Sequence, residues 1–387
     1  MLTLPNRVYA QIDLDAMCSN VSQAMERMKP AKLMAIIKAD AYGHGAVRSA
    51  KALDEIGVDS YGVATADEAV ELREAGITKP ILILGYVFPE SFDDMIKYGI
   101  NLAVFDYHTA ELLDSHAKAL GKTALIHIKA DTGMGRIGFQ PCEQSVEDIK
   151  KINALENVRI NGMFTHFACA DSKDKTSVNS QIERFKSFVG AVRDAGVTLP
   201  TVHCYNSASI VDFDKPLFDM VRCGIITYGL EPSDEVSKTN IKLKKVMSIK
   251  SHIAHVKKVG AGFTVSYGST YVTDGERDIA TVPVGYGDGY PRTLSNKGRV
   301  IVNGHYANIV GRVCMDQFMI DVTGLDVKQG DEVILIGSDS KNTVTAEEIG
   351  DLSGRFNYEL VCDINKRVPR VYIKNGEIIA VDNALVK

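Results

Sequence analysis

Short apolar runs alternate with helical stretches along roughly the first 240 residues. The apolar runs occupy 32–40, 61–65, 80–85, 102–106, 124–131, 159–168, 201–206 and 219–225. The stretches between them include 67–76, 89–99, 143–154 and 178–195, where apolar and polar residues recur with a helical period. Each run is apolar enough for a parallel strand that is buried on both faces. The pattern therefore predicts an α/β fold whose N-terminal part is a (β/α)8 TIM-type barrel.

Polar residues whose side chains can take part in catalysis or ligand binding lie at or just after the carboxyl ends of these runs. They are Lys38, Thr65, Asp106, Lys129, Asp131, His166, Asn206 and Arg222. Loops are generally polar, so any single one of these positions has an ordinary structural explanation. Barrels, however, build their active sites at the carboxyl ends of their strands. The repeated occurrence of basic and nucleophilic types there predicts a site at the barrel mouth.

From about Lys245 the hydrophobic period changes to two. Segments 277–290, 299–322, 331–337 and 370–381 alternate or are rich in β-branched residues, and Asn303-Gly304 and Asn375-Gly376 are hairpin-turn dipeptides. We therefore expect a second, mainly β domain at the C-terminal end. The predicted domains are residues 1–244 for the barrel and 245–387 for the β domain.

Composition excludes several classes of partner. The chain has 387 residues, 44 Lys and Arg against 49 Asp and Glu, and a formal net charge of −5. No basic surplus is present that nucleic acid or an anionic membrane would attract. The opening segment has no apolar run of signal-peptide length, and no stretch reaches a membrane span. We expect a cytoplasmic protein that acts on a small molecule.

The seven cysteines are dispersed and odd in number. They stand at 18, 142, 169, 204, 223, 314 and 362, without a CxxC pair. This spacing argues against a disulfide framework and against a structural zinc site, so no metal is expected.

Segment 35–45, AIIKADAYGHG, resembles the signature of alanine racemases that binds pyridoxal 5′-phosphate (PLP). Further matching segments follow in the family's order at 127–139, 163–171, 203–209, 221–230, 264–271, 284–292, 311–322, 355–360 and 367–372. The resemblance thus covers essentially the whole chain. It implies a PLP-dependent isomerase that interconverts L- and D-alanine and supplies D-alanine for bacterial peptidoglycan.

Inversion of a stereocentre needs a proton to leave one face and return on the other, which favours two bases. By resemblance, Lys38 carries the cofactor and is one base, and Tyr267 from the partner subunit of a homodimer is the other. A desolvated lysine disfavours its charged form, which suits this role. A phenol is a poor base near neutral pH, and the resemblance implies that His166 bridges it to Arg222.

The resemblance also assigns the remaining site. Its cofactor-binding residues are Lys38, Tyr42, Arg136, His166, Asn206, Ser207, Arg222, Gly224, Ile225 and Tyr358. Its substrate-binding residues are Arg136, Met315 and Tyr286, of which Tyr286 is equally well explained as a turn-flanking aromatic. Lys129 is a possible site of carbamylation, because a carbamate would pair with Arg136 where an unmodified amine would repel it.

Three alternatives stay open. A racemase of another small amino acid such as serine would differ by a few pocket contacts, and an apolar pocket rejects an added hydroxyl only by about 10²-fold. A PLP-dependent decarboxylase of similar fold would use an acidic partner for the pyridine nitrogen, which Arg222 disfavours. A non-catalytic PLP-binding protein would need Lys38 but would have no use for Tyr267 with His166.

Overall fold

Eight parallel strands close into a barrel in the computed structural model, which describes residues 4, 5 and 7–386. They are β2 (Lys32–Ile36), β3 (Ser60–Val63), β4 (Ile81–Ile83), β5 (Asn101–Val104), β6 (Ala124–Lys129), β7 (Val158–Phe164), β8 (Val202–His203) and β9 (Met220–Cys223). The strands follow one another in chain order, and β2 closes the barrel against β9. Every position of β3, β5 and β9 is buried, as expected for parallel strands covered on both faces. The predicted barrel is confirmed.

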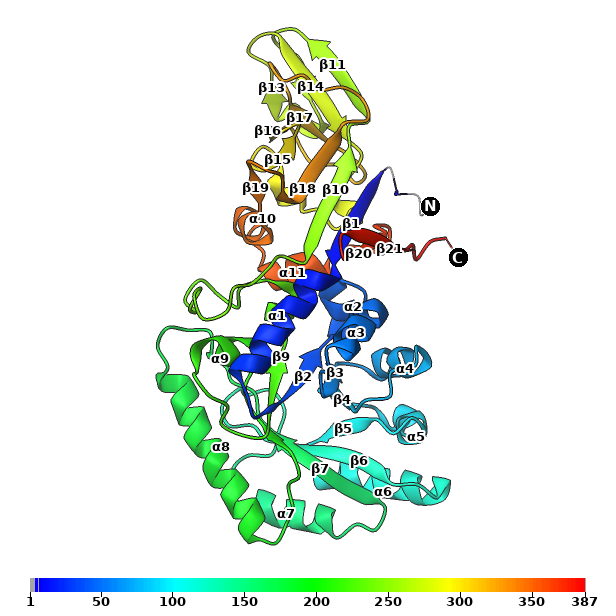
Figure 1. Ribbon diagram of the computed structural model, residues 1–387, viewed down its shortest axis with the longest axis vertical. Coiled ribbons are helices and arrows are strands. Elements are labelled where there is room, and N and C mark those ends of the chain that lie inside the picture. The colour runs from blue at the N-terminus through cyan, green and yellow to red at the C-terminus, as the bar shows by residue number, and fades with distance from the viewer. Residues whose placement is uncertain (1–3, 6, 387) are drawn as a thin grey trace.

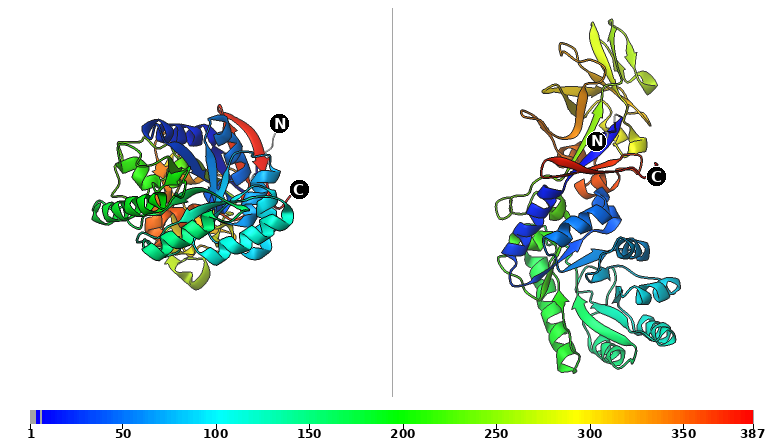
Figure 2. Two further views of the ribbon diagram at one scale, coloured as in Figure 1. Left: turned by 90° about the horizontal axis from the view of Figure 1, so that it is seen from below. Right: turned by 45° about the vertical axis from the view of Figure 1, so that its right-hand side comes forward.

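Helices surround these strands (Figures 1 and 2). They are α1 (Leu14–Arg27), α2 (Lys38–Gly43), α3 (Ala46–Glu55), α4 (Ala66–Glu74), α5 (Phe92–Lys97), α6 (Tyr107–Leu120), α7 (Glu143–Asn153), α8 (Thr176–Asp194) and α9 (Ser207–Asp212), with short 3-10 turns η1 (Pro89–Ser91) and η2 (Ile225–Tyr228). Thr65 and Asp106 cap α4 and α6, because their side chains accept from the backbone N–H of Glu68 and Thr109. These two strand-end residues therefore have a structural use.

An 11-stranded sheet forms most of the rest of the molecule, in the upper part of Figure 1. Its strands are β1 (Val8–Asp13), β10 (Met247–His252), β11 (His255–Val259), β14 (Arg277–Val282), β15 (Arg299–Val302), β16 (His305–Val310), β17 (Phe318–Asp321), β18 (Glu332–Ser338), β19 (Thr343–Val344), β20 (Arg370–Lys374) and β21 (Glu377–Asp382). A separate ribbon pairs β12 (Thr264–Val265) with β13 (Tyr271–Val272). Burial along β10 alternates strictly, which is the period of two read from the sequence.

Two-residue turns make the hairpins that the sequence predicts. Asn303-Gly304 joins β15 to β16 and Asn375-Gly376 joins β20 to β21, with positive φ at all four residues. Two helices, α10 (Ala346–Ser353) and α11 (Asn357–Cys362), and the 3-10 turns η3 (Tyr267–Ser269), η4 (Tyr286–Asp288) and η5 (Arg292–Leu294) complete this part. The mainly β character of the C-terminal domain is confirmed.

The first strand lies in the large sheet and not in the barrel. β1 pairs antiparallel with β10 and parallel with β20, so the chain starts in the β domain and crosses into the barrel at α1. Buried Asn20 of α1 then fixes the return crossing, since its side chain exchanges two hydrogen bonds of 2.8 Å with the backbone of Lys244. The division between residues 244 and 245 stays a prediction.

Nowhere in residues 4, 5 and 7–386 is there a helix long and apolar enough to cross a membrane.

The α2 turn packs on α11 of the β domain at the junction of the two parts. Gly43 lies at this contact with a φ of +79°, and a Cβ there would collide with the carbonyl oxygen of Val361. Gly57 has a similar φ of +85° but open space around it. The two glycines therefore share a backbone requirement and differ in packing.

We predict that Gly43→Ala destabilises the protein by at least about 3 kcal/mol, because left-handed strain and a backbone collision add. Gly57→Ala, the matched control, should cost only about 1–2 kcal/mol from the strain alone. Urea denaturation of both variants measures the difference. Equal losses of stability in the two variants would mean that the α2–α11 contact adjusts to the added Cβ at no cost in free energy.

Candidate active site

A cavity of about 510 Å³ opens at the carboxyl ends of the barrel strands. Eleven of the fourteen residues predicted from the sequence line it together: Lys38, Tyr42, Lys129, Arg136, His166, Asn206, Ser207, Arg222, Gly224, Ile225 and Tyr358. Ten of them come from the barrel and Tyr358 comes from α11, so the β domain supplies part of the wall. This is the end of the barrel at which the fold places active sites.

A left-handed turn follows Lys38 directly. Residues 39–42 have φ between 51° and 53°, although none of them is a glycine. This conformation costs about 1–2 kcal/mol for each L-residue, so contacts elsewhere must hold it. A right-handed helix here would aim the side chains of Lys38 and Tyr42 differently. The turn therefore sets where the lysine and the tyrosine enter the cavity.

Hydrogen bonds from two elements, α4 and β20, hold the turn. Glu68 of α4 accepts from the N–H of Ala39 at 2.7 Å, and also from the N–H of Ala64 at 2.7 Å. Buried Arg370 of β20 donates from Nε to the carbonyl oxygen of Gly43 at 3.0 Å and from its other nitrogens to three more carbonyls of its own segment. Hence the barrel fixes the start of the turn and the β domain fixes its end.

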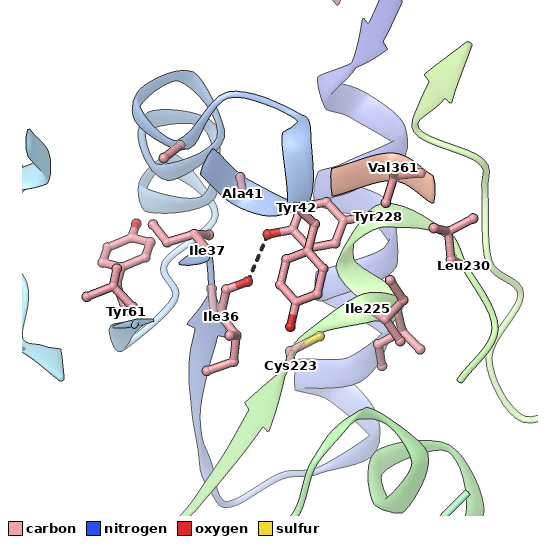
Figure 3. Close-up of a cluster of buried hydrophobic side chains, with 14 of the residues drawn as sticks. Ile36, Ile37, Ala41, Tyr42, Tyr61, Cys223, Ile225, Tyr228, Leu230 and Val361 are labelled. Carbon is pink, nitrogen blue, oxygen red and sulfur yellow. Dashed lines mark hydrogen bonds between the residues drawn. The ribbon is translucent and has the colours of Figure 1, made fainter. Parts of the chain in front are cut away.

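Aromatic rings pack behind the same turn. The Tyr42 and Tyr228 ring centroids are 4.9 Å apart, and the Tyr228 hydroxyl donates to the carbonyl oxygen of Ile36 at 2.8 Å, at the end of β2 (Figure 3). Figure 3 also shows Val361 of α11 beside this cluster. The end of β2, which leads to Lys38, is thus held in place from its buried side.

Polar groups suited to an anion converge at one side of the cavity. The N–H of Gly224 donates to Ser207 Oγ at 2.9 Å, and a Cβ on Gly224 would lie 3.4 Å from that oxygen and 3.5 Å from the Tyr42 hydroxyl. Burial raises the pKa of Tyr42 and of Tyr358, so both phenols keep their protons and can donate. Hydroxyls that can donate, beside a backbone that no side chain shields, are groups suited to bind a phosphate.

Arg222 lies at the centre of a buried hydrogen-bond chain. Its NH1 is 2.9 Å from His203 Nδ1, and its NH2 is 3.3 Å from His166 Nδ1 and 2.7 Å from the carbonyl oxygen of Thr165. A guanidinium can only donate, so both histidine Nδ1 atoms must accept. His203 then carries its proton on Nε2, which lies 3.1 Å from His127 Nδ1. Each hydrogen bond of this chain is therefore donated outward from Arg222: Arg222 donates to both histidines, and His203 donates to His127.

The charge state of each group in this hydrogen-bond chain follows from its burial and its neighbours. Burial and the charge of Arg222 lower the pKa of His166 and of His203 well below the usual value, so both imidazoles are neutral. Burial lowers the pKa of Arg222 to about 10, which still leaves it charged near neutral pH. Arg222 therefore presents a permanent cation to the cavity.

Two lysines share this cationic environment. Burial and then the charge of Arg136 lower the pKa of Lys38. Burial, Arg222 and Arg136 together lower the pKa of Lys129 to about 7. Asp131, the nearest acid, is occupied with the backbone N–H groups of residues 133–136. Both amines consequently have a larger neutral fraction than an exposed lysine, and a neutral amine is a nucleophile.

The other three predicted residues lie elsewhere in the chain. Tyr267 and Met315 line a different, open cavity on the β domain, and Tyr286 lines neither. All three are exposed, by 71%, 52% and 43%. Their loops are nevertheless fixed, because Tyr286 and Gly287 donate backbone hydrogen bonds to the carbonyl oxygens of Cys314 and Met315. A single chain does not bring Tyr267 to Lys38.

Sequence reasoning missed Glu68 and Arg370 as residues of this site. Glu68 could have been found as the fourth position of the capping box that starts at Thr65. No comparable signal identifies Arg370, which reaches the turn from 327 residues away in the sequence. His127 likewise reads as a strand residue of the barrel until the contact with His203 is known.

The fold and this cavity define a class: two-domain proteins with a barrel whose mouth holds a lysine of lowered pKa beside hydroxyl and guanidinium donors. Sequence profiles of the alanine racemase N-terminal and C-terminal domains match residues 12–232 and 246–372. The chain belongs to the alanine racemase family. The family, fold class and enzyme class predicted from the sequence, an isomerase, are thereby confirmed.

Individual relatives agree with this membership. The alanine racemase of Clostridium novyi is 47% identical over 378 residues, which cover 97% of this chain and 98% of the relative. The structure of alanine racemase from Clostridium difficile superposes with a TM-score of 0.95 at 43% identity and covers both chains completely. A structure of alanine racemase from Bartonella henselae with covalently bound pyridoxal phosphate has a TM-score of 0.84 at 29% identity, covering 95% of this chain and 100% of that one.

We predict that Glu68→Ala weakens the hold on the turn, because the N–H of Ala39 loses its acceptor. Hydrogen exchange of the Ala39 amide should become faster, and the free energy of unfolding should fall by about 1–3 kcal/mol. Thr65→Ala, the matched control, removes the cap of α4 but leaves Glu68 in place. It should leave exchange at Ala39 unchanged, and equal exchange in both variants would refute the role of Glu68.

Proposed function

We propose that this protein racemises alanine with PLP held in the cavity at the barrel mouth. The observation that carries the proposal is that Lys38, whose pKa is lowered, lines one cavity with ten other family-type residues, among them the hydrogen-bonded pair Ser207 and Gly224. PLP, when bound, supplies an electron sink that makes the α-hydrogen of an amino acid removable. The relatives named alanine racemase support alanine as the substrate.

Lys38 is proposed to bond covalently to the cofactor and to act as one base. Burial and the neighbouring Arg136 favour its neutral amine, which is the form that attacks a carbonyl and accepts a proton. The Bartonella relative with covalently bound pyridoxal phosphate supports a covalent link of this kind. The left-handed turn holds this amine at the barrel mouth, where it would serve both as the attachment point of the cofactor and as a base.

The phosphate is proposed to bind to Tyr42, Ser207, Gly224, Ile225 and Tyr358. The residues present fit that group, because the Ser207 hydroxyl, the Gly224 backbone and two protonated phenols line the same cavity. Asn206 lies beside them as the cap of α9. These residues bind and orient the cofactor and take no proton themselves.

Arg222 is proposed to donate a hydrogen bond to the pyridine nitrogen. Because its pKa stays near 10, it cannot hand that nitrogen a proton at neutral pH. A carboxylic acid could do so, and this difference disfavours the decarboxylase alternative. His166, neutral and accepting from Arg222 at Nδ1, has an Nε2–H that can hold the hydroxyl of a second base.

Tyr267 from a second subunit is proposed as that second base, with Met315 and Tyr286 contacting the substrate beside it. All three side chains are exposed, and backbone hydrogen bonds tie the loop of Tyr286 to that of Met315. Exposed apolar side chains on ordered loops are typical of a surface that a second subunit covers. We infer a homodimer in which each cavity receives these residues from the other chain. Arg136, which lines the cavity, would bind the substrate carboxylate.

Two alternative functions differ in measurable ways. A racemase of serine would exchange the α-hydrogen of serine faster than that of alanine, and a non-catalytic PLP-binding protein would exchange neither. We favour alanine as the substrate. We infer that the reaction takes place in the cytoplasm of a bacterium and supplies D-alanine for cell-wall peptidoglycan. Exchange of the α-hydrogen in heavy water, measured over a panel of amino acids, separates these functions.

We predict that Lys38→Ala abolishes exchange of the α-hydrogen of alanine, because Lys129, the other lysine that lines the cavity, does not lead into the left-handed turn. Borohydride reduction of the wild type with PLP, followed by peptide mapping, should place the label on Lys38. Lys129→Ala should keep the label at Lys38. Label on Lys129 or on any other lysine would contradict the assignment.

We predict that Tyr267→Phe impairs the reaction from L-alanine more than the reaction from D-alanine, since the two bases act on opposite faces. The exchange rate of the α-hydrogen is measured separately from each enantiomer. Tyr98→Phe removes an exposed phenol hydroxyl on α5's C-terminal side and serves as the control with unchanged rates. Equal residual rates from both enantiomers in Tyr267→Phe would exclude the two-base scheme.

We predict that Lys129 takes up carbon dioxide as a carbamate, which would pair with Arg136 across the cavity. The new N–C bond needs the neutral amine and releases one proton to solvent. With a pKa of about 7, that amine is available above pH 7 and is lost to protonation as the pH falls below it. A carbamate signal in ¹³C NMR with labelled bicarbonate should follow this course and be absent in Lys129→Gln. A signal that persists in the variant would place it elsewhere.

A further inference from the structure

A cluster of four charged side chains lies in the β domain, and none of the four lines the cavity at the barrel mouth. Arg7 donates to Asp288 twice, from Nη2 to Oδ1 at 2.6 Å and from Nη1 to Oδ2 at 3.0 Å. Arg367 has its Nε 3.5 Å from Asp288 Oδ1 and donates from Nη2 to Asp316 Oδ1 at 2.7 Å. Guanidiniums and carboxylates thus alternate along these contacts, and we call the four residues the Asp288 cluster.

Asp288 is the buried member of the cluster, with a side chain that is 1% exposed. A buried carboxylate is costly unless charges and hydrogen bonds compensate it, and Arg7 does so with two bonds. Asp288 Oδ2 also accepts from the N–H of Gly285 at 3.1 Å, and the N–H of Asp288 donates to the carbonyl oxygen of Gly285 at 3.0 Å. These reciprocal bonds close the η4 turn, so the buried carboxylate fixes the backbone on both sides of Tyr286.

The η4 turn lies directly against a second loop, residues 312–316. Besides the two backbone hydrogen bonds described above, the approach is so close that a Cβ on Gly285 would lie 2.2 Å from the carbonyl oxygen of Cys314. A Cβ on Gly287 would lie 2.5 Å from Arg367 Nη1, so this guanidinium packs against the turn while its Nη2 binds the second loop. Arg367 therefore holds the turn and the second loop together.

A third loop, residues 265–269, is tied to the second loop. Ser266 Oγ donates to the carbonyl oxygen of Arg312 at 2.6 Å. Tyr267 of the third loop and Met315 of the second line one open cavity of about 460 Å³. The loops 265–269, 285–288 and 312–316 are thus connected by hydrogen bonds, and we call them the three-loop surface.

The exposed side chains of this surface depend on its backbone for their positions. Tyr267, Tyr286 and Met315 are all exposed, so packing within their own chain holds them little. The loops beneath them are held by hydrogen bonds and by the buried carboxylate of Asp288. A misplacement of about 1 Å in a substrate contact can cost about 10²-fold in rate. Loss of the charge of Asp288 should therefore alter substrate binding although Asp288 itself touches no substrate.

We propose that Asp288 is the positioning residue of the three-loop surface. Its pairs with Arg7 and Arg367 fix the loops. The loops in turn hold Tyr286 and Met315 at the separation that binding of a small amino acid requires. This inference rests on the proposed function, because these two side chains meet the substrate only in the cavity of a second subunit. It adds that a buried ion pair in one chain sets the substrate fit in the cavity of the other.

Asp288→Asn tests the proposal, because it keeps the shape of the side chain and removes its charge. KM for alanine should rise at least about tenfold while kcat changes by less than about twofold, since displaced binding contacts weaken the substrate complex and the transition state alike. Both constants are measured on the full-length protein loaded with PLP.

Glu348→Gln is the matched control. Glu348 belongs to α10, outside the three loops, and it also pairs with an arginine through both oxygens, at 2.8 Å and 3.2 Å from Arg299. Its loss should lower the stability of the protein and leave KM unchanged. A rise in KM that equals the rise in Asp288→Asn would mean that any broken ion pair of the β domain has this effect, and it would overturn the proposal.

A mixing experiment shows in which chain Asp288 acts. Asp288→Asn is mixed with an excess of the inactive variant Lys38→Ala under conditions that exchange subunits. The heterodimer has one active cavity, which combines Lys38 of the Asp288→Asn chain with intact loops of the other chain. KM for alanine should therefore return to the wild-type value. A raised KM that persists in the heterodimer would mean that Asp288 acts within its own chain, and it would overturn the proposal.

Arg367→Gln keeps the question decidable if Asp288→Asn fails to fold. It removes the link between the η4 turn and the second loop but leaves the pair of Arg7 with buried Asp288 in place. KM should rise in this variant too, and mixing with Lys38→Ala should restore it. An unchanged KM in Arg367→Gln would refute the inference and leave alanine racemisation untouched. A wild type that does not racemise alanine would instead refute the proposed function, and the inference with it.

Discussion

Four consecutive left-handed residues after Lys38 are the constraint on which the geometry of the barrel mouth depends. The chain would not keep this turn unaided, because each residue in it is about 1–2 kcal/mol above the right-handed alternative. The barrel supplies Glu68 at one end of the turn, and the β domain supplies Arg370 and the α11 contact at the other. The position of the lysine is therefore a property of both domains together. This gives a physical reason for a barrel of this kind to occur with its β domain.

The pKa values of the groups at the barrel mouth follow from their burial between the barrel and the β domain. Lys38, Lys129, Arg136 and Arg222 line one cavity, while Asp131 and Glu68 accept from backbone N–H groups. Burial and mutual repulsion lower the pKa of both lysines, while the guanidinium of Arg222 keeps its charge and sets the tautomers of His166 and His203. The cavity thus combines lysine amines of lowered pKa with the fixed cation of Arg222. That combination suits a ligand with a phosphate, a carboxylate and a carbonyl-type carbon.

Local patterns predicted much of this structure, and non-local contacts account for the rest. The alternation of apolar runs and helices predicted all eight barrel strands, and two Asn-Gly pairs predicted the hairpins. Eleven candidate residues met in one cavity because strand ends share one rim. The sequence KADAYG, however, has the composition of an ordinary helix, and its left-handed form depends on partners hundreds of residues away. The pairing of β1 with β10 and β20 is equally invisible to a local reading.

The central claim is that the amine of Lys38 and the phenol of Tyr267 meet in one site built from two chains. Mixing two inactive variants, Lys38→Ala and Tyr267→Phe, under conditions that exchange subunits tests this most directly. A heterodimer contains one cavity with both groups intact, so the account predicts that racemisation of alanine returns in the mixture and not in either variant alone. No recovery, with subunit exchange demonstrated by mass spectrometry of the mixed dimer, would contradict it.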